Sequence, residues 1–193
     1  MKRVAILLCG LALTVIPLKS APAETVYTYS YVGNPFTDVT SPFTTSDFIT
    51  ASFTTNSLLA ANSVFGETDI YPTTFSVSDG IDTITNGNPG VDFETITFST
   101  DAVGDITEWD FHIADQTTGN IMTQNFKDSP IFGTEIRDLS IQFPSLAQGE
   151  VLNDPGVWSV SETTATTPEP SSIALLGSGA LGIIGLMRRR LLV

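Results

Sequence analysis

The chain has 193 residues and a formal net charge of −13, with 21 acidic residues against eight basic ones. A chain this acidic repels nucleic acid and anionic lipid, so nucleic-acid binding is excluded as an expected function. The only cysteine is at position 9, which excludes a framework of disulfide bonds.

Residues 1–23 have the pattern of a secretory signal peptide. Two basic residues at positions 2 and 3 precede an apolar run at 4–16, which is shorter than the ~20 residues that a membrane-spanning helix needs. Small residues then precede a site where signal peptidase is expected to cut, between residues 23 and 24. The sequence therefore predicts an exported chain. The residues of the expected cleavage site are Ala21, Ala23 and Glu24.

The charge of the remaining chain is concentrated in its middle. Residues 24–167 hold two basic and twenty acidic residues, a net charge of −18. We divide this part into an acidic β domain at 24–160 and a Thr-rich linker at 161–167. Apolar residues alternate with polar ones at a period of two, which is typical of strands with one buried face. About eight to ten short strands are expected, and the predicted fold class is all-β, an antiparallel β-sandwich or jelly-roll-like domain.

In the first half of the domain, three alternating segments predict strands that each have one inward face. Asp79-Gly80 fits a two-residue hairpin turn after the third segment. A short helix is an alternative for residues 57–61. The expected inward residues are Tyr27, Tyr29, Tyr31, Ile49, Ala51, Phe53, Phe75 and Val77.

In the second half, the alternation breaks between Phe93 and Ile96, which predicts a β-bulge. Turns are expected at 101–105 and 117–120. The segment 106–113 places its acidic residues and the only histidine outward. The expected inward residues of this half are Trp109, Phe111, Ile113, Leu139, Ile141 and Phe143.

Little in this domain predicts catalysis. His112 lies on an outward face, and the chain has no G-x-S-x-G motif to accompany a Ser–His–Asp arrangement. Glu94, Glu108 and Asp110 are candidate hydrolase carboxylates by residue type alone. With one histidine and no cysteine in the mature chain, we predict no zinc site and no cofactor. The sequence favours a protein that is not an enzyme.

Oxygen-rich turns give weak candidates for a calcium site, because calcium binds six to eight oxygen ligands. Neither the EF-hand spacing nor a glycine-rich calcium repeat accompanies them, and ordinary hairpin turns are the preferred interpretation. The candidate residues are Asp79, Asp82, Asp92, Asp101 and Asp105.

The last segment, 168–193, has three parts. The triplet Pro168-Glu169-Pro170 comes first, and its prolines keep the backbone extended. An uncharged run at 171–187 follows, whose length of about 25 Å as a helix is marginal for a hydrocarbon core of about 30 Å. Three arginines then stop translocation and stay in the cytoplasm. We expect a single transmembrane helix here, at the other end of the chain from the N-terminal signal helix. The arginines are Arg188, Arg189 and Arg190.

The order of these three parts, at the end of the chain, resembles the PEP-CTERM sorting signal. Proteins with this signal are exported by Gram-negative bacteria that make exopolysaccharide. The resemblance implies that an exosortase, a membrane-embedded cysteine transpeptidase, cuts near the triplet. It implies transient anchoring in the inner membrane, followed by release to the cell surface or the extracellular matrix.

Three functional hypotheses remain. The first is a non-enzymatic protein of the cell surface or matrix, associated with exopolysaccharide or biofilm. The second is a carbohydrate- or calcium-binding module, which surface tryptophans would favour, although Trp109 and Trp158 both fit inward positions better. The third is a secreted hydrolase.

Overall fold

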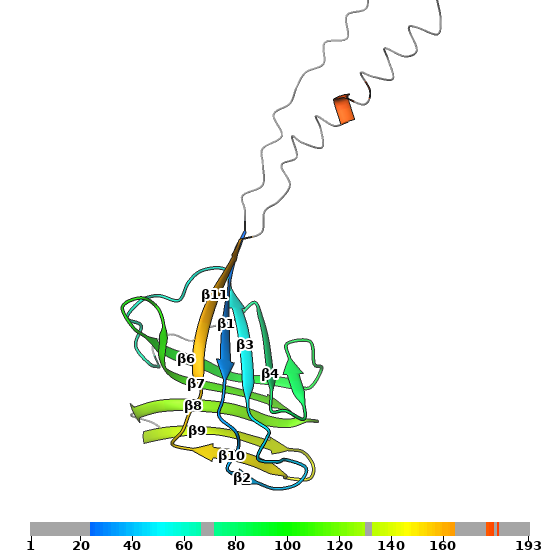
Figure 1. Ribbon diagram of the computed structural model, residues 1–193, viewed down its shortest axis with the longest axis vertical. Helices are drawn as coiled ribbons and strands as arrows, with labels where there is room; N and C mark the ends of the chain where they lie inside the picture. Colours follow the sequence, from blue (N-terminus) through cyan, green and yellow to red (C-terminus); the bar gives the residue numbers. More distant parts are fainter. Residues whose placement is uncertain (1–23, 67–71, 130–132, 165–176, 180, 182–193) are drawn as a thin grey trace, which may run out of the picture. The chain divides into compact units, whose positions relative to one another are not determined.

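The computed structural model describes residues 24–66, 72–129, 133–164, 177–179 and 181. The chain divides into two compact units, residues 24–165 and the two terminal segments 1–23 and 166–193. The described strands all belong to the first unit and form two antiparallel sheets (Figure 1). The all-β, antiparallel prediction is therefore confirmed, whereas the expected signal helix lies outside the described residues.

Sheet A has five strands in the order β11-β1-β3-β4-β5, and sheet B has six in the order β2-β10-β9-β8-β7-β6. The strands of sheet A are β1 (Thr25–Val32), β3 (Thr50–Thr55), β4 (Thr74–Ser78), β5 (Thr83–Thr85) and β11 (Val157–Thr164). The strands of sheet B are β2 (Asp38–Val39), β6 (Val91–Thr100), β7 (Ile106–Asp115), β8 (Gly119–Ser129), β9 (Gly133–Gln142) and β10 (Gln148–Leu152).

The core lies between the two sheets, whose strands cross steeply in Figure 1. Aromatic rings dominate it, because they bury large apolar areas and interlock edge to face. Phe53 of sheet A stacks on Phe98 of sheet B with 5.3 Å between ring centroids. Trp158 of β11 lies among five further rings at centroid distances of 5.2–6.4 Å, so the last strand closes the core.

The period-two pattern located most of the inward faces correctly. The predicted bulge is confirmed by a register shift between Phe93 and Thr95. The turn at 101–105 is also confirmed, since β6 ends at Thr100 and β7 begins at Ile106. The predicted inward residues that are buried in the core are Tyr29, Tyr31, Ile49, Ala51, Phe53, Phe75, Val77, Trp109, Phe111 and Ile113.

Three local predictions are wrong. The hairpin between β4 and β5 has a four-residue loop at 79–82 rather than a two-residue turn, because Ser78 pairs with Thr83. Residues 57–61 are not helical and belong to an irregular connection. Residues 161–164, assigned to the linker, pair with the start of β1 as the last part of β11.

The inward face of β9 is the largest correction. Leu139 and Ile141 were expected to enter the core, but Asp138 and Ser140 point toward sheet A instead. Leu139 is 6% exposed on the opposite face, where it is in register with Met122 of β8. This strand has residues suited to burial on both faces, so the alternation of apolar and polar residues misidentified the core side.

Candidate functional site: buried carboxylates and acidic turns

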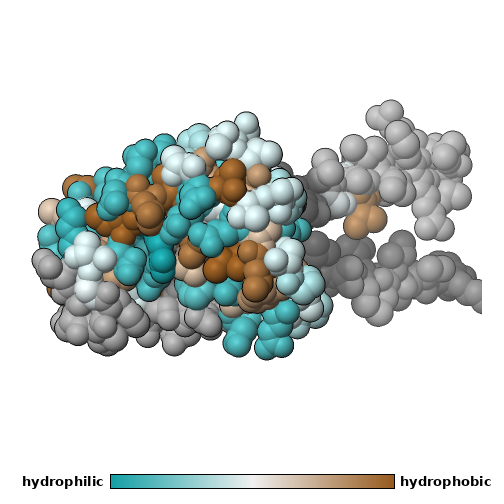
Figure 2. Space-filling model, turned by 90° about the horizontal axis from the view of Figure 1, so that it is seen from below, coloured by the Kyte–Doolittle hydropathy of each residue, from teal (hydrophilic) through white to brown (hydrophobic). Residues whose placement is uncertain are grey.

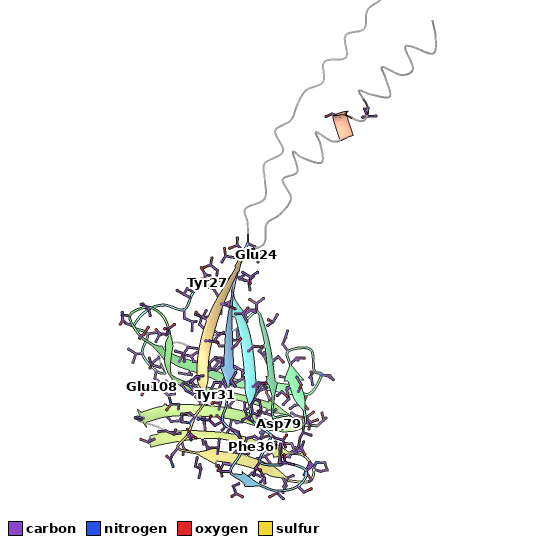
Figure 3. The ribbon with its side chains drawn as sticks, in the orientation of Figure 1. Glu24, Tyr27, Tyr31, Phe36, Asp79 and Glu108 are labelled. Atoms are coloured by element: carbon purple, nitrogen blue, oxygen red, sulfur yellow. The ribbon has the colours of Figure 1, made fainter. Side chains whose placement is uncertain are left out.

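A buried polar cluster joins the sheets where β1 crosses sheet B. The Tyr31 hydroxyl lies 2.8 and 2.9 Å from the two carboxylate oxygens of Asp138, to which it donates its proton. It accepts a hydrogen bond from the Gly156 backbone N–H at 2.7 Å. Tyr31 and Asp138 are 1% and 0% exposed. Figure 3 shows Tyr31 near the end of β1, over the strands of sheet B.

Thr123 extends this cluster within sheet B. Its hydroxyl accepts a hydrogen bond from the Trp109 indole N–H at 2.8 Å and is hydrogen-bonded to Asp138. A buried polar group without a hydrogen-bond partner costs free energy, so loss of any one member of the cluster would destabilise the groups that are bonded to it. The cluster therefore fixes the positions of β1, β8, β9 and the start of β11.

The pKa values of the cluster are strongly shifted. Burial raises the pKa of Asp138 to about 6, against the opposing effect of hydrogen bonds from Thr123 and Tyr31. Burial, and then the nearby Asp138 charge, raise the pKa of Tyr31. Tyr31 therefore keeps its proton and acts as a donor, and Asp138 titrates close to neutral pH.

A second buried contact joins the β4–β5 hairpin to β9. One oxygen of Asp79 accepts the backbone N–H groups of Ile81 and Asp82 at 2.9 and 2.8 Å, and so shapes the loop. The other accepts the Ser140 hydroxyl at 2.6 Å. The Gln142 amide donates to Asp82 at 2.7 Å. Asp79, labelled in Figure 3 at the end of β4, is thus both a turn residue and a contact between the sheets.

We expect Ser140→Ala to destabilise the domain by about 1–2 kcal/mol, because it leaves the buried Asp79 oxygen without its donor. The matched control is Ser99→Ala, which removes a hydroxyl that donates at 3.1 Å to Glu108 in a partly buried pair. Urea unfolding should show a change below about 0.5 kcal/mol for the control. Equal effects of the two variants would contradict a stabilising role for the hydrogen bond between Ser140 and Asp79.

The calcium candidates are divided among three elements, with Asp79 and Asp82 in the β4–β5 loop, Asp92 on β6, and Asp101 and Asp105 in the β6–β7 turn. Asp101 accepts the backbone N–H groups of Val103 and Asp105 at 2.9 and 3.0 Å, and these bonds lower its pKa. Asp92 is exposed on β6. Within the ranges that the structure describes, no group of three or more Asp, Glu, His or Cys side chains lies close enough to hold a metal ion. Asp79, Asp82 and Asp101 are instead engaged in turn and inter-sheet hydrogen bonds.

Two of the three hydrolase candidates, Glu108 and Asp110, lie on the outer face of sheet B. Glu108 accepts from Ser99, and Asp110 accepts the Gln124 amide at 3.0 Å. Gln124 accepts in turn from Arg137 at 3.0 Å. His112, on the same face, is in register with Met122. The Glu94 side chain lies outside the described residues. Glu108 and Asp110 are thus each hydrogen-bonded to a residue of a neighbouring strand.

One small cavity lies beside β11 and is lined by residues that include Tyr29, Ile106 and Trp158. Its volume of about 10 Å³ is that of a single water molecule, so it is too small for a substrate. Neither tryptophan presents a free ring face for stacking on a sugar, since Trp109 is 4% exposed and the partly buried Trp158 packs among five core rings.

Sequence reasoning missed the Tyr31–Asp138 pair. The available signal was an acidic residue and a serine alternating inside a predicted strand, in the run RDLSIQF. Burying a carboxylate without a partner costs free energy. An acidic residue inside a strand therefore indicates either an exposed face or a buried hydrogen-bond partner. The pattern alone could not decide between them.

The sorting segment lies mostly outside the described residues, including its Pro-Glu-Pro triplet and its arginines. Residues 177–179 and 181 are helical and exposed. Among the described residues, none of the helices combines the length and the apolar character needed to span a membrane. The expected transmembrane helix at 171–187 is therefore still a prediction.

Comparison with known proteins identifies this segment. Residues 166–190 match the family described as the PEP-CTERM protein-sorting motif. No curated protein and no solved structure matches the chain.

Proposed function

Because the chain carries a PEP-CTERM protein-sorting motif at residues 166–190, we propose that it is an exosortase-processed protein of the cell surface or extracellular matrix, associated with exopolysaccharide. The motif implies export, transient membrane sorting and an exosortase as the processing partner. The match to this motif is the observation that carries the proposal.

Two features of the chain support the proposal. The signal-peptide pattern at 1–23 provides the route of export. The β domain is a compact unit of its own, and its last strand ends at Thr164, just before the matched segment begins at residue 166. A cut near the triplet would release the domain with all eleven described strands.

We further propose that the domain acts by binding rather than by catalysis. The candidate carboxylates Glu108 and Asp110 are hydrogen-bonded across strands, and Asp138 is sealed in the core. The described domain has a high negative charge, which keeps an exported protein soluble at high concentration.

Replacing Pro168-Glu169-Pro170 with three alanines should block processing and leave the full-length protein in the membrane fraction. Alanines allow helix where the two prolines forbid it, so the extended segment before the membrane is lost. Immunoblots of membrane and extracellular fractions measure the outcome. The matched control replaces Thr166 and Thr167, the two residues just before Pro168, with alanines, which keeps the whole triplet and every residue of β11. If the triplet variant is cut and released as efficiently as the wild type, the proposal is wrong.

A further inference from the structure

The outer face of sheet A has an unusual composition. Sixteen side chains point away from the core on its five strands, thirteen of them Ser or Thr and three Val, with no charged residue. We call these sixteen residues the hydroxyl face. Its members are Val26, Thr28, Ser30, Val32, Thr50, Ser52, Thr54, Thr74, Ser76, Ser78, Thr83, Thr85, Val157, Ser159, Ser161 and Thr163.

The strand register arranges these hydroxyls in rows across the sheet. The middle row runs through all five strands, with Ser52 at its centre. Strands lie about 4.8 Å apart and alternate residues about 6.7 Å apart along a strand, so the face presents a regular two-dimensional array. The middle row consists of Ser159, Ser30, Ser52, Ser76 and Thr85.

The hydroxyls of the array can both donate and accept. Thr54 and Thr74 are joined across strands by a hydroxyl–hydroxyl contact of 2.7 Å. Ser159 donates to the Ser30 backbone carbonyl at 3.3 Å. Ser78 and Thr85 donate their hydroxyl protons to the Asp82 carbonyl and the Asn88 side chain at 2.7 and 2.8 Å. A hydroxyl has one donor and two acceptor positions, so hydroxyls that donate within the domain still leave acceptor positions for a ligand. Every member of the face is at least partly exposed.

The charge distribution restricts what can occupy this face. The domain around it carries a net charge of −18 in residues 24–167, which repels polyanions. A polycation would be drawn to the carboxylates elsewhere rather than to an uncharged array. An uncharged ligand that is itself rich in hydroxyl groups meets complementary donors and acceptors at no electrostatic cost.

A second copy of the chain fits this face poorly. Five strands at about 4.8 Å spacing and outward residues over about 20 Å give roughly 400 Å², half of the ~800 Å² per partner of a stable interface. The face also has no aromatic anchor of the kind that dominates protein interfaces. On the part of the surface seen in Figure 2, polar residues interrupt the apolar patches, so no continuous apolar surface for a second copy is visible there either.

We propose that the hydroxyl face binds a neutral polysaccharide, laid across the strands and held by many weak hydrogen bonds. This inference deepens, and rests on, the matrix association proposed above. Each hydrogen bond contributes little on its own, since hydroxyls are already solvated by water. Binding therefore depends on repetition along a polymer and is weak for a single sugar.

Affinity electrophoresis of the exported protein tests the proposal. Native gels that contain dextran, pullulan, galactomannan or the neutral polysaccharide fraction of the producing cells should retard the wild type through at least one of them. Gels that contain alginate, a polyanion, should not. Ser52→Asp should weaken retardation roughly tenfold or more, because the new carboxylate would be desolvated without a partner. Ser52→Asn, which stays uncharged, should retain most of it.

Ser57→Asp is the matched control, because it adds the same charge at an exposed position of the 56–66 connection. It should leave retardation unchanged, and circular dichroism should show that all variants are folded. Wild type that none of the neutral polysaccharides retards, or equal losses in the Ser52→Asp and Ser57→Asp variants, would overturn the inference. So would a dimer in light scattering that Ser52→Asp dissociates. A protein that is processed normally but binds nothing refutes only this inference and leaves the sorting proposal intact.

Discussion

Gly156→Ala is expected to destabilise the β domain by more than about 3 kcal/mol, because a methyl group has no space at this position. Its Cβ would overlap the carbonyl oxygen of Val32 and lie 2.5 Å from the Gly33 Cα. Both neighbours are backbone atoms and cannot rotate away. The shift needed to admit the methyl group would also weaken the hydrogen bond from Gly156 to Tyr31. Urea unfolding of the exported protein measures the loss.

Gly87→Ala is the control for this prediction. A Cβ at residue 87 would make only an ordinary contact of 3.6 Å with Thr85. We expect its effect on the free energy of unfolding to stay within about 1 kcal/mol. If the two alanine variants unfold at the same urea concentration, the prediction that Gly156 packs tightly against the backbone of Val32 and Gly33 is contradicted.

Asp138→Asn should change the pH dependence of stability. Asp138 has a pKa of about 6 in the folded domain against an ordinary value of 3.8, so the folded state holds its proton more tightly than the unfolded state. The wild type therefore loses stability from this group as pH rises from about 4 through 6, by about 3 kcal/mol at 1.36 kcal/mol per pKa unit. The uncharged Asn keeps a carbonyl oxygen for Tyr31 and pays no such cost.

The measurement is the difference between the two unfolding free energies across this pH range. It should move in favour of the Asn variant by about 3 kcal/mol between pH 4 and pH 8. Asp115→Asn is the control of opposite sign. Hydrogen bonds from Thr117 and Thr118 lower the pKa of Asp115, so this residue stabilises the domain above its ordinary pKa and the benefit is lost as pH falls. A difference for Asp138→Asn that does not vary with pH would contradict the buried-carboxylate assignment.

Much of the fold could be predicted because most strands have a single buried face. The aromatic residues of β1, β3 and β7 alternate with polar ones, and that pattern fixes which side meets the core. Strands β2 and β5 have two and three residues, which is too short for any periodic signal. The length of the β4–β5 loop was missed because Asp79-Gly80 suggested a two-residue turn, while Asp79 in fact bonds to Asp82 and to the opposite sheet.

The candidate site was less predictable than the fold. The sorting motif is a local signal that can be recognised from neighbouring residues, and its presence is confirmed by the match at residues 166–190. The Tyr31–Asp138 pair joins residues 107 positions apart, and the sequence around either residue does not indicate which residue is its partner. The hydroxyl face requires the register of five strands, because each strand alone shows only ordinary polar residues on its outer side.

The pairing of β1 with β11 has a consequence for timing. During export β1 is the first strand of the domain to emerge and β11 is the last, yet the two are paired, with Thr25 opposite Thr164. Contacts between the two ends of a chain form slowly. The edge of β1 that pairs with β11 therefore stays unpaired until the whole domain has emerged, whereas its other edge can already pair with β3. Only residues 165–167 separate β11 from the triplet in the sequence. The last strand of the domain and the proposed cleavage site are therefore exported almost together, so a delay in the pairing of β11 would leave that strand unpaired when the sorting motif is processed.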